Sequence, residues 1–195
     1  MSRINWKGSV LLAPVPPTMV TSSFDGKDNV FTVAWTGVLN TRPPKTYIAV
    51  RPERYSYELI KNSGEFVINL TTKDMIRAAD WCGTYTGRRV DKFVKQKLEK
   101  LPAENVSAPI LAASPVALEC KVCEVVPLGS HHLFVADIVS LSVDEKFVDD
   151  KGKLRLDKAG LAAYAHGDYF ELGKKIGTFG FAVQKRHTKN KKSGS

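Results

Sequence analysis

The sequence contains little cysteine and no long apolar run, and each shortage argues against a class of protein. Its three cysteines, Cys82, Cys120 and Cys123, leave one thiol over in any pairing scheme, so we do not expect a disulfide framework. The apolar stretch at residues 10–20 is short and is broken by three prolines, so it cannot cross a bilayer. The N-terminal residues lack the pattern of a secretory signal. We therefore expect a cytoplasmic protein without a membrane segment.

Common catalytic and metal-binding motifs are also missing. Cys120 and Cys123 have CxxC spacing, but no second ligand pair accompanies them, and they lie in an alternating run typical of a strand. His131 and His132 are adjacent in a turn-like segment and have no carboxylate partner motif. The glycines at 173, 177 and 180 do not form the GxGxxG dinucleotide fingerprint. We predict no metal site and no side chain that carries the chemistry by itself, and the role of Cys82 stays open.

Positive charge is concentrated at one end of the chain. The formal net charge is +9 over 195 residues, and 43% of residues are hydrophobic and 25% charged, as in an ordinary globular protein. Five cations and no acid fall in residues 184–195, so the remainder carries only +4. We predict a single domain over residues 1–183 and a basic, disordered tail over residues 184–195. Nucleic-acid binding is the minority interpretation, and we expect no nucleic-acid partner.

Short β-type segments outnumber helical ones. Asp25-Gly26 in a polar run predicts a hairpin connection, and Pro43-Pro44 interrupts the chain before another β-rich segment. The pattern predicts helices at residues 56–62 and 72–80, a further hairpin at residues 147–156, and strands at residues 19–21, 30–35, 46–50, 65–70, 116–126 and 133–143. The expected fold class is mainly β, a β-barrel with helical decorations.

Several segments, in a fixed order along most of the chain, resemble one known family. They are PPTMVTS at residues 16–22, NVFTVAW at 29–35, RPP at 42–44, RYSYELI at 54–60, GEFVIN at 64–69, the loop and DKF at 83–93, and DYFELG at 168–173. Together they resemble the flavin reductase-like, FMN-binding split-barrel family, which includes flavoredoxin. The resemblance implies an FMN-binding split barrel that forms a homodimer, with the flavins near the subunit interface.

Arg54 and Ser56 are the candidates for the FMN phosphate. At the start of the predicted helix they would offer a guanidinium, a hydroxyl and free backbone N–H groups together. The alternative is that Ser56 only caps the helix and Arg54 is a solvated surface residue. Arg51 would add positive charge near the phosphate or the reduced ring. Tyr57, in the same motif, is also predicted to bind the cofactor.

The isoalloxazine ring of the flavin needs a flat apolar contact and backbone groups for its polar edge. The segment of residues 32–36 would supply both, and its candidates are Thr32, Ala34, Trp35 and Thr36. For Trp35, an ordinary place as a core aromatic is an alternative of equal weight to a contact with the flavin. Asn40 is a candidate donor to the ring or ribityl chain, although an asparagine near a turn needs no ligand to explain it.

Three further cofactor candidates follow from the resemblance. Asn69 ends an apolar strand, where a local hydrogen bond to the backbone is its simplest explanation. His166 and Tyr169 lie in a segment similar to one that approaches the flavin in relatives.

Function then follows from the flavin, whose N5 accepts hydride while the protein binds and orients it. The leading hypothesis is an NAD(P)H-dependent flavin reductase-like oxidoreductase that transfers electrons from NADH or NADPH. The alternative is a flavoredoxin-type electron carrier without its own nicotinamide site. A basic β-barrel that binds nucleic acid is the more distant alternative.

Overall fold

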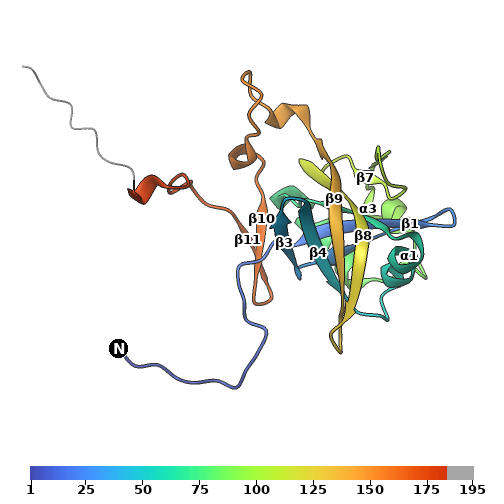
Figure 1. The fold of residues 1–195 in the computed structure, drawn as a ribbon, viewed down its shortest axis with the longest axis horizontal. Helices are drawn as coiled ribbons and strands as arrows, with labels where there is room; N and C mark the ends of the chain where they lie inside the picture. The colour runs from blue at the N-terminus through green and yellow to red at the C-terminus, as the bar shows by residue number, and fades with distance from the viewer. Residues whose placement is uncertain (184–195) are drawn as a thin grey trace, which may run out of the picture.

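A seven-stranded antiparallel sheet forms the centre of this computed structural model, which describes residues 1–183 (Figure 1). The strands pair in the order β2-β1-β5-β8-β9-β4-β3. Their bounds are β1 Thr18–Phe24, β2 Lys27–Val33, β3 Thr36–Thr41, β4 Pro44–Val50, β5 Glu65–Asn69, β8 Val116–Pro127 and β9 His132–Val143. The mainly-β prediction is confirmed.

Two hairpins show how well the turns were predicted. Asp25 and Gly26 connect β1 to β2, and both have positive φ (51° and 70°), as a two-residue hairpin turn requires. The predicted break at Pro43-Pro44 is part of a second hairpin, because Thr41 pairs with Pro44. The sequence analysis missed its first strand, β3, which contains a glycine and an asparagine that disfavour strands.

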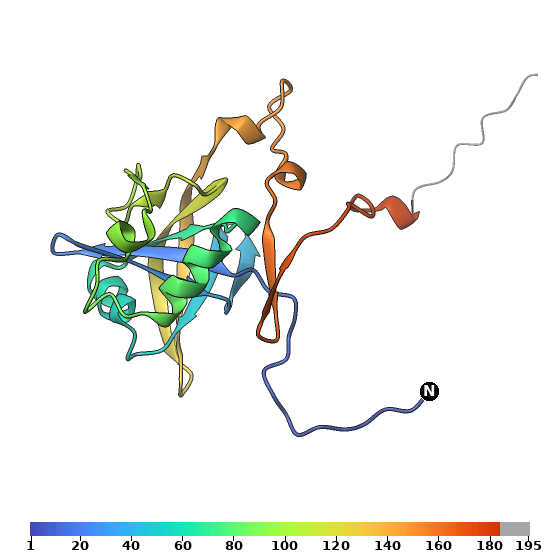
Figure 2. The ribbon, with the colours of Figure 1, turned by 180° about the vertical axis from the view of Figure 1, so that it is seen from behind.

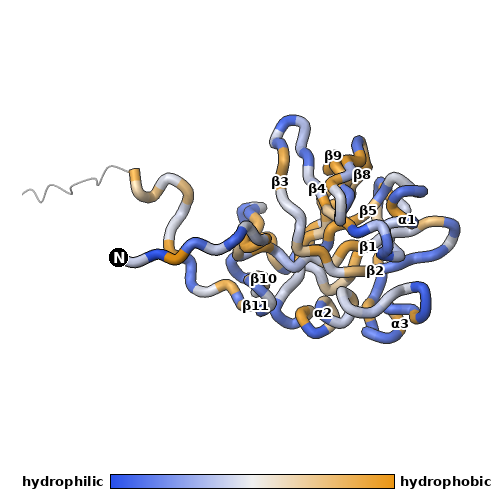
Figure 3. The backbone as a smooth tube through the Cα atoms, turned by 90° about the horizontal axis from the view of Figure 1, so that it is seen from below, coloured by the Kyte–Doolittle hydropathy of each residue, from blue (hydrophilic) through white to orange (hydrophobic). Residues whose placement is uncertain are grey.

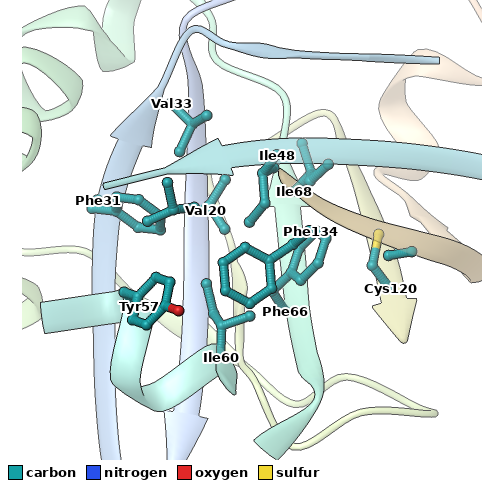
Figure 4. Close-up of a cluster of buried hydrophobic side chains, with 12 residues drawn as sticks. Val20, Phe31, Val33, Ile48, Tyr57, Ile60, Phe66, Ile68, Cys120 and Phe134 are labelled. Carbon is teal, nitrogen blue, oxygen red and sulfur yellow. The ribbon is translucent and has the colours of Figure 1, made fainter. Parts of the chain in front are cut away.

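The sheet curls around one hydrophobic core. Neighbouring residues point to opposite faces, so Val20 and Phe31 face the interior of the barrel while Met19 and Val30 face outward. Figure 4 shows the inward side chains, which come from β1, β2, β4, β5, β8, β9 and one helix. The barrel interior is therefore filled by side chains.

Helices close one end of the barrel and cover one outer face. They are α1 Tyr55–Ser63, α2 Ile76–Thr84 and α3 Lys92–Gln96. Tyr57 and Ile60 of α1 enter the barrel core, while α2 and α3 pack on the outer face of β1 and β2 through Ala79, Cys82 and Phe93 (Figure 2). Both predicted helices are present, although the second begins as a 3-10 turn, η1 Lys73–Met75.

A small hairpin follows the barrel. Its strands, β10 Ala162–Ala165 and β11 Asp168–Glu171, were not predicted. Backbone bridges join Tyr164 to Val15 and Leu161 to Thr72, so the hairpin is attached beside the start of the barrel. The hairpin predicted at residues 147–156 is reduced to a turn with one bridge, between Val148 and Leu154. The remaining two-stranded ladder joins β6 Lys100–Leu101 to β7 Ile110–Leu111.

Across residues 1–183, no helix is long and apolar enough to span a membrane. In the same part of the chain, no three His, Cys, Asp or Glu side chains are grouped so as to hold a metal ion. The tail predicted at residues 184–195 lies outside the described residues.

Asn69 joins three parts of the fold, and its substitution by alanine is expected to destabilise the protein. Its buried side-chain amide donates to the Met19 carbonyl (3.0 Å) and accepts from the Leu111 N–H (2.9 Å). Asn69→Ala leaves these backbone groups unpaired and should lower the free energy of unfolding by about 1 to 3 kcal/mol in urea denaturation. Asn62→Ala, at an exposed position of α1, is the control, with a change in the free energy of unfolding within about 0.5 kcal/mol. Equal stability of the two variants would contradict this role.

Candidate functional site

A cavity of about 670 Å³ opens where the ends of β2 and β4 meet α2 and the β10–β11 hairpin. Its volume lies in the range usual for cofactor sites, roughly 300 to 1,000 Å³. Half of the residues predicted to bind the cofactor line it: Thr32, Ala34, Trp35, Arg51, Arg54 and Tyr169. The fold therefore brings together candidates that are up to 137 positions apart in the sequence.

The floor of the cavity depends on close packing between β2 and α2. The Thr32 hydroxyl donates to the Ala79 carbonyl of α2. One turn further along, a Cβ on Gly83 would lie only 3.2 Å from the Thr32 Cβ, so a larger residue would push the helix away. Arg54 donates to the Gly83 carbonyl (2.9 Å) and so connects this floor to the start of α1.

A smaller hollow of about 200 Å³ adjoins the cavity at the N-terminus of α1, and we call it the cationic hollow. It shares Phe31, Arg51 and Arg54 with the main cavity. Ser56 is buried at its base and accepts a hydrogen bond from the Asn29 amide (2.7 Å). Arg54 is the N-cap of α1 and makes no side-chain cap bond, so the helix N-terminus is not covered by that side chain. Arginines and a helix N-terminus together favour an anion.

Lys92 completes the cationic hollow and was missed as a site residue. Its side chain is only 3% exposed, and its ammonium donates to the Cys82 carbonyl (2.7 Å). Among residues 1–183, no carboxylate forms a salt bridge with it. Burial, reinforced by the charge of Arg54, lowers the pKa of Lys92 to about 8. A buried cation without a salt-bridge partner among these residues favours an anion in the hollow.

Gly87 forms the outer wall of the cationic hollow. A Cβ at this position would lie 2.2 Å from the Asn29 side-chain oxygen and 2.9 Å from the Tyr55 ring. The backbone at Gly87 therefore lies so close to the Asn29 and Tyr55 side chains that only glycine fits there. The loop in the family segment at residues 83–93 begins only after Thr84, since Gly83 and Thr84 belong to α2.

Aromatic and imidazole rings stand at the mouth of the main cavity. Trp35 is 49% exposed, and its ring stacks with His131 of the β8–β9 turn at a centroid distance of 5.9 Å. The alternative that Trp35 is a buried core aromatic is therefore wrong. Burial and the neighbouring charge of Arg51 lower the pKa of His131, which favours a neutral ring at the mouth.

Tyr169 holds the β10–β11 hairpin against α2. Its hydroxyl donates to the Asp80 carboxylate (3.1 Å), and both residues line the main cavity. Burial, together with this hydrogen bond, raises the pKa of Tyr169 to about 12, so the phenol stays protonated. The pair therefore forms part of the cavity wall.

A second hollow of about 440 Å³ adjoins the main cavity at Trp35, and we call it the apolar hollow. Thr36 and His166, both predicted cofactor residues, line this hollow and do not line the main cavity. The two spaces share four residues: Val10, Ala34, Trp35 and Tyr164. A molecule in the apolar hollow would therefore lie beside the contents of the main cavity.

Three predicted cofactor residues line none of these spaces. Tyr57 is packed in the barrel core, and its hydroxyl is 2.8 Å from His132 Nδ1. Asn40 donates to the Pro43 carbonyl (2.9 Å), which matches the turn explanation. Asn69 has the structural hydrogen bonds described above.

The two buried cysteines, Cys82 and Cys120, do not form a reactive group. Burial raises the pKa of the Cys82 thiol to about 11 and that of Cys120 to about 12, so both stay protonated near neutral pH. Cys120 faces the barrel core and Cys123 lies exposed further along the same strand, as expected for a structural CxxC. Cys82 lies on the buried face of α2, and its carbonyl accepts a hydrogen bond from Lys92.

Comparisons with known proteins bear on this arrangement. The flavoredoxin of Desulfovibrio vulgaris (Miyazaki F) superposes with a TM-score of 0.87 at 27% identity, covering 94% of this chain and 100% of that one. A flavoredoxin from Methanosarcina acetivorans gives a TM-score of 0.85 at 25% identity, with the same coverage of 94% and 100%. An uncharacterized protein of Archaeoglobus fulgidus is 31% identical over 140 residues, which are 72% of this chain and 78% of that protein. The model of the flavin reductase like domain matches residues 11–173, and the chain belongs to this family of split-barrel proteins.

Proposed function

We propose that this chain binds FMN in the main cavity and transfers electrons through it as an NAD(P)H-dependent flavin reductase-like oxidoreductase. The observation that carries the proposal is the junction between the main cavity and the cationic hollow. Phe31, Arg51 and Arg54 line both, so one elongated ligand would place an anionic end and a planar end in continuous space. FMN has this shape, with a phosphate at one end and a flavin ring at the other.

The cationic hollow fits a terminal phosphate. Arg54, Lys92 and the N-terminus of α1 would hold the phosphate oxygens, with Ser56 as a further hydroxyl partner. Arg51 would add charge from the edge of the barrel. The phosphate would in turn supply the anion that buried Lys92 lacks among the described residues.

The main cavity fits the ring. Bound FMN supplies an N5 that accepts and releases hydride, while the protein supplies position and electrostatics. Thr32 and Ala34 would lie along the ring from the end of β2, and Tyr169 would limit its movement from the opposite wall. Trp35 and His131 would narrow the mouth and reduce the access of water.

The apolar hollow would admit the electron donor or acceptor. It meets the main cavity at Ala34 and Trp35, so a nicotinamide entering it would approach the flavin ring from the side of the mouth. His166 and Thr36 would contact this second molecule, which differs from their predicted role with FMN. This assignment supports a reductase that binds NADH or NADPH.

A flavoredoxin-type carrier is the second candidate, and the flavoredoxins among the similar structures support it. Two solved structures similar to this chain over 94% of its length are flavoredoxins. A carrier would exchange electrons with a protein partner at the exposed mouth beside Trp35. In either case we propose a cytoplasmic homodimer with the flavins near the interface and no nucleic-acid partner.

Anaerobic visible spectroscopy separates these candidates. The purified protein should show the bands of oxidised flavin, and the reductase proposal predicts that NADH or NADPH bleaches them within seconds to minutes. Bands that persist until dithionite is added would contradict the reductase and support the carrier. A colourless protein that takes up no added FMN but binds oligonucleotides in a salt-sensitive way would contradict both.

The affinity for FMN should weaken at alkaline pH because Lys92 loses its proton. The pKa of Lys92 in the free protein is about 8, so binding a phosphate dianion above this pH requires proton uptake. The FMN dissociation constant should rise about tenfold between pH 7.5 and 9.5, measured by quenching of flavin fluorescence. Lys92→Met should bind more weakly at pH 7.5 and change little over this range.

Lys95→Met is the matched control, since Lys95 lies exposed on the same helix. It should keep the affinity and the pH dependence of the wild type. A Lys92→Met variant with wild-type affinity and an unchanged pH profile would exclude Lys92 from the phosphate site.

A further inference from the structure

Positive charge is concentrated in one segment of the described chain. Residues 76–100 contain seven Lys or Arg and three Asp or Glu, a net charge of +4. The other residues of the range 1–183 contain equal numbers of cations and acids. The whole excess charge of the described chain therefore lies in 25 consecutive residues, which form α2, α3 and the chain around them.

This segment covers one face of the barrel. α2 and α3 both pack on the outer side of β1 and β2, in one cluster that includes Ala79, Cys82 and Phe93. Figure 3 shows the two helices along the same edge of the molecule, with hydrophilic stretches in blue beside both. We call the outward side of the segment the basic face, and its side chains are Arg77, Trp81, Tyr85, Arg89, Val94, Lys95 and Lys97.

The cations of the basic face have no acidic partner within residues 1–183. Two other cations of the segment are neutralised, since Arg88 pairs with Glu58 (2.8 Å) and Lys100 pairs with Asp28 (2.7 Å). Four exposed cations form no salt bridge in that range: Arg77, Arg89, Lys95 and Lys97. Unpaired surface charges of one sign raise the local potential and attract a partner of the opposite sign.

Large side chains stand among these cations. Arg77 and Trp81 are one helical turn apart, and the Trp81 ring stacks with that of Tyr85 at a centroid distance of 4.4 Å. Tyr85 is 52% exposed, and Val94 on α3 is 75% exposed. Tryptophan, tyrosine and arginine are the residue types that contribute most to binding at protein interfaces. The basic face therefore has the composition of a docking surface.

The arrangement favours an acidic protein over a nucleic acid. Trp81 and Tyr85 each cover a face of the other's ring, which leaves fewer ring faces for stacking bases. Asp80, Asp91 and Glu99 lie among the cations and would repel a continuous phosphate backbone. Carboxylates on a folded protein are instead placed one by one, so they can match separate cations.

The basic face lies on the other side of a wall of the proposed flavin site. Asp80 and Thr84 of α2 line the main cavity, and Tyr85 also lines the cationic hollow. A helix with its side chains is about 10 to 12 Å across. A protein bound to the basic face would therefore lie about one helix diameter from the space proposed for the flavin.

We propose that the basic face docks a small electron-transfer protein with an acidic surface and that this protein exchanges electrons with the flavin. Two reduced one-electron donors would convert one oxidised FMN to its two-electron-reduced form, with protons from solvent, and would leave oxidised. The electron transfer rests on the proposed function, whereas the docking does not. The chain would then have a protein-docking surface in addition to the mouth at Trp35.

The test uses the FMN-loaded full chain and a plant-type ferredoxin, a small acidic iron–sulfur protein, as the probe. Reduced ferredoxin is mixed with the protein anaerobically, and the second-order rate constant of flavin bleaching is measured by stopped flow. It should fall roughly tenfold between about 0.05 and 0.5 M NaCl, because added ions screen the opposite charges. The triple variant Arg77→Gln, Arg89→Gln and Lys95→Gln should be about tenfold slower at the lower salt concentration and should lose most of the salt dependence.

A second triple variant, Lys61→Gln, Lys151→Gln and Lys158→Gln, is the matched control. It removes the same charge from exposed positions outside the basic face. This variant should keep the wild-type rate constant at each salt concentration. Equal rate constants for the two triple variants, or a wild-type rate constant that does not change with salt, would overturn the docking surface. Displacement of ferredoxin by an oligonucleotide at a lower concentration than by polyglutamate would overturn the choice of an acidic protein.

Calorimetric titration with oxidised ferredoxin separates this proposal from the proposed function, because it needs no flavin. If ferredoxin binds the chain and binding is lost in the variant of the basic face, the docking surface stands even where the chain binds no FMN. If the chain binds FMN but ferredoxin neither binds nor bleaches it, the docking proposal fails and the proposed function stands.

Discussion

Closure of the antiparallel sheet around a single core is the constraint on which the site depends. Side chains from six strands meet inside the barrel, and this brings β2 and β4 close together although they lie at different places in the strand order. The chain leaves β2 at Val33 and leaves β4 at Val50, so the segments with Trp35 and Arg51 emerge beside each other. Without this closure, the planar end and the cationic end of the site would not share a wall.

The buried ammonium of Lys92 carries a free-energy cost that the site has to offset. Removing an ammonium from water is unfavourable unless it gains hydrogen bonds or an opposite charge, and the lowered pKa records that cost. The Cys82 carbonyl offsets part of it. The phosphate of the proposed FMN would offset more. The same reasoning assigns Cys82 a positioning role through its backbone and leaves its thiol inert.

The sequence predicted local structure well where short-range chemistry decides it. Asp25-Gly26 specifies a tight hairpin, and Gly64 ends α1 in the left-handed conformation (φ 70°), so the elements around them were predicted correctly. Strand β3 was missed because its glycine and asparagine disfavour strands and only pairing with β4 holds it in place. Long-range pairing of this kind leaves little trace in a single sequence.

The site could be predicted only in part, for a similar reason. Ala34 and Arg54 were predicted because the family pattern marks them, and both line the main cavity. Lys92 was not predicted as a site residue, although it lies in the DKF segment that Sequence analysis quoted. Lysines are usually on the surface, and only the fold shows that this one is buried. Asn40 and Tyr57 were predicted to bind the cofactor because they lie near the family motifs. In the structure, Asn40 donates a hydrogen bond within a turn, and Tyr57 packs in the barrel core.

The most direct test of the account compares FMN with riboflavin, which has the same ring and no phosphate. Flavin-free protein would be titrated with each at pH 7, and quenching of flavin fluorescence would give both dissociation constants. The account predicts that FMN binds at least about a hundredfold more tightly, because charge-assisted hydrogen bonds are worth about 1.5 to 3 kcal/mol each. Equal affinities for FMN and riboflavin would contradict a phosphate in the cationic hollow.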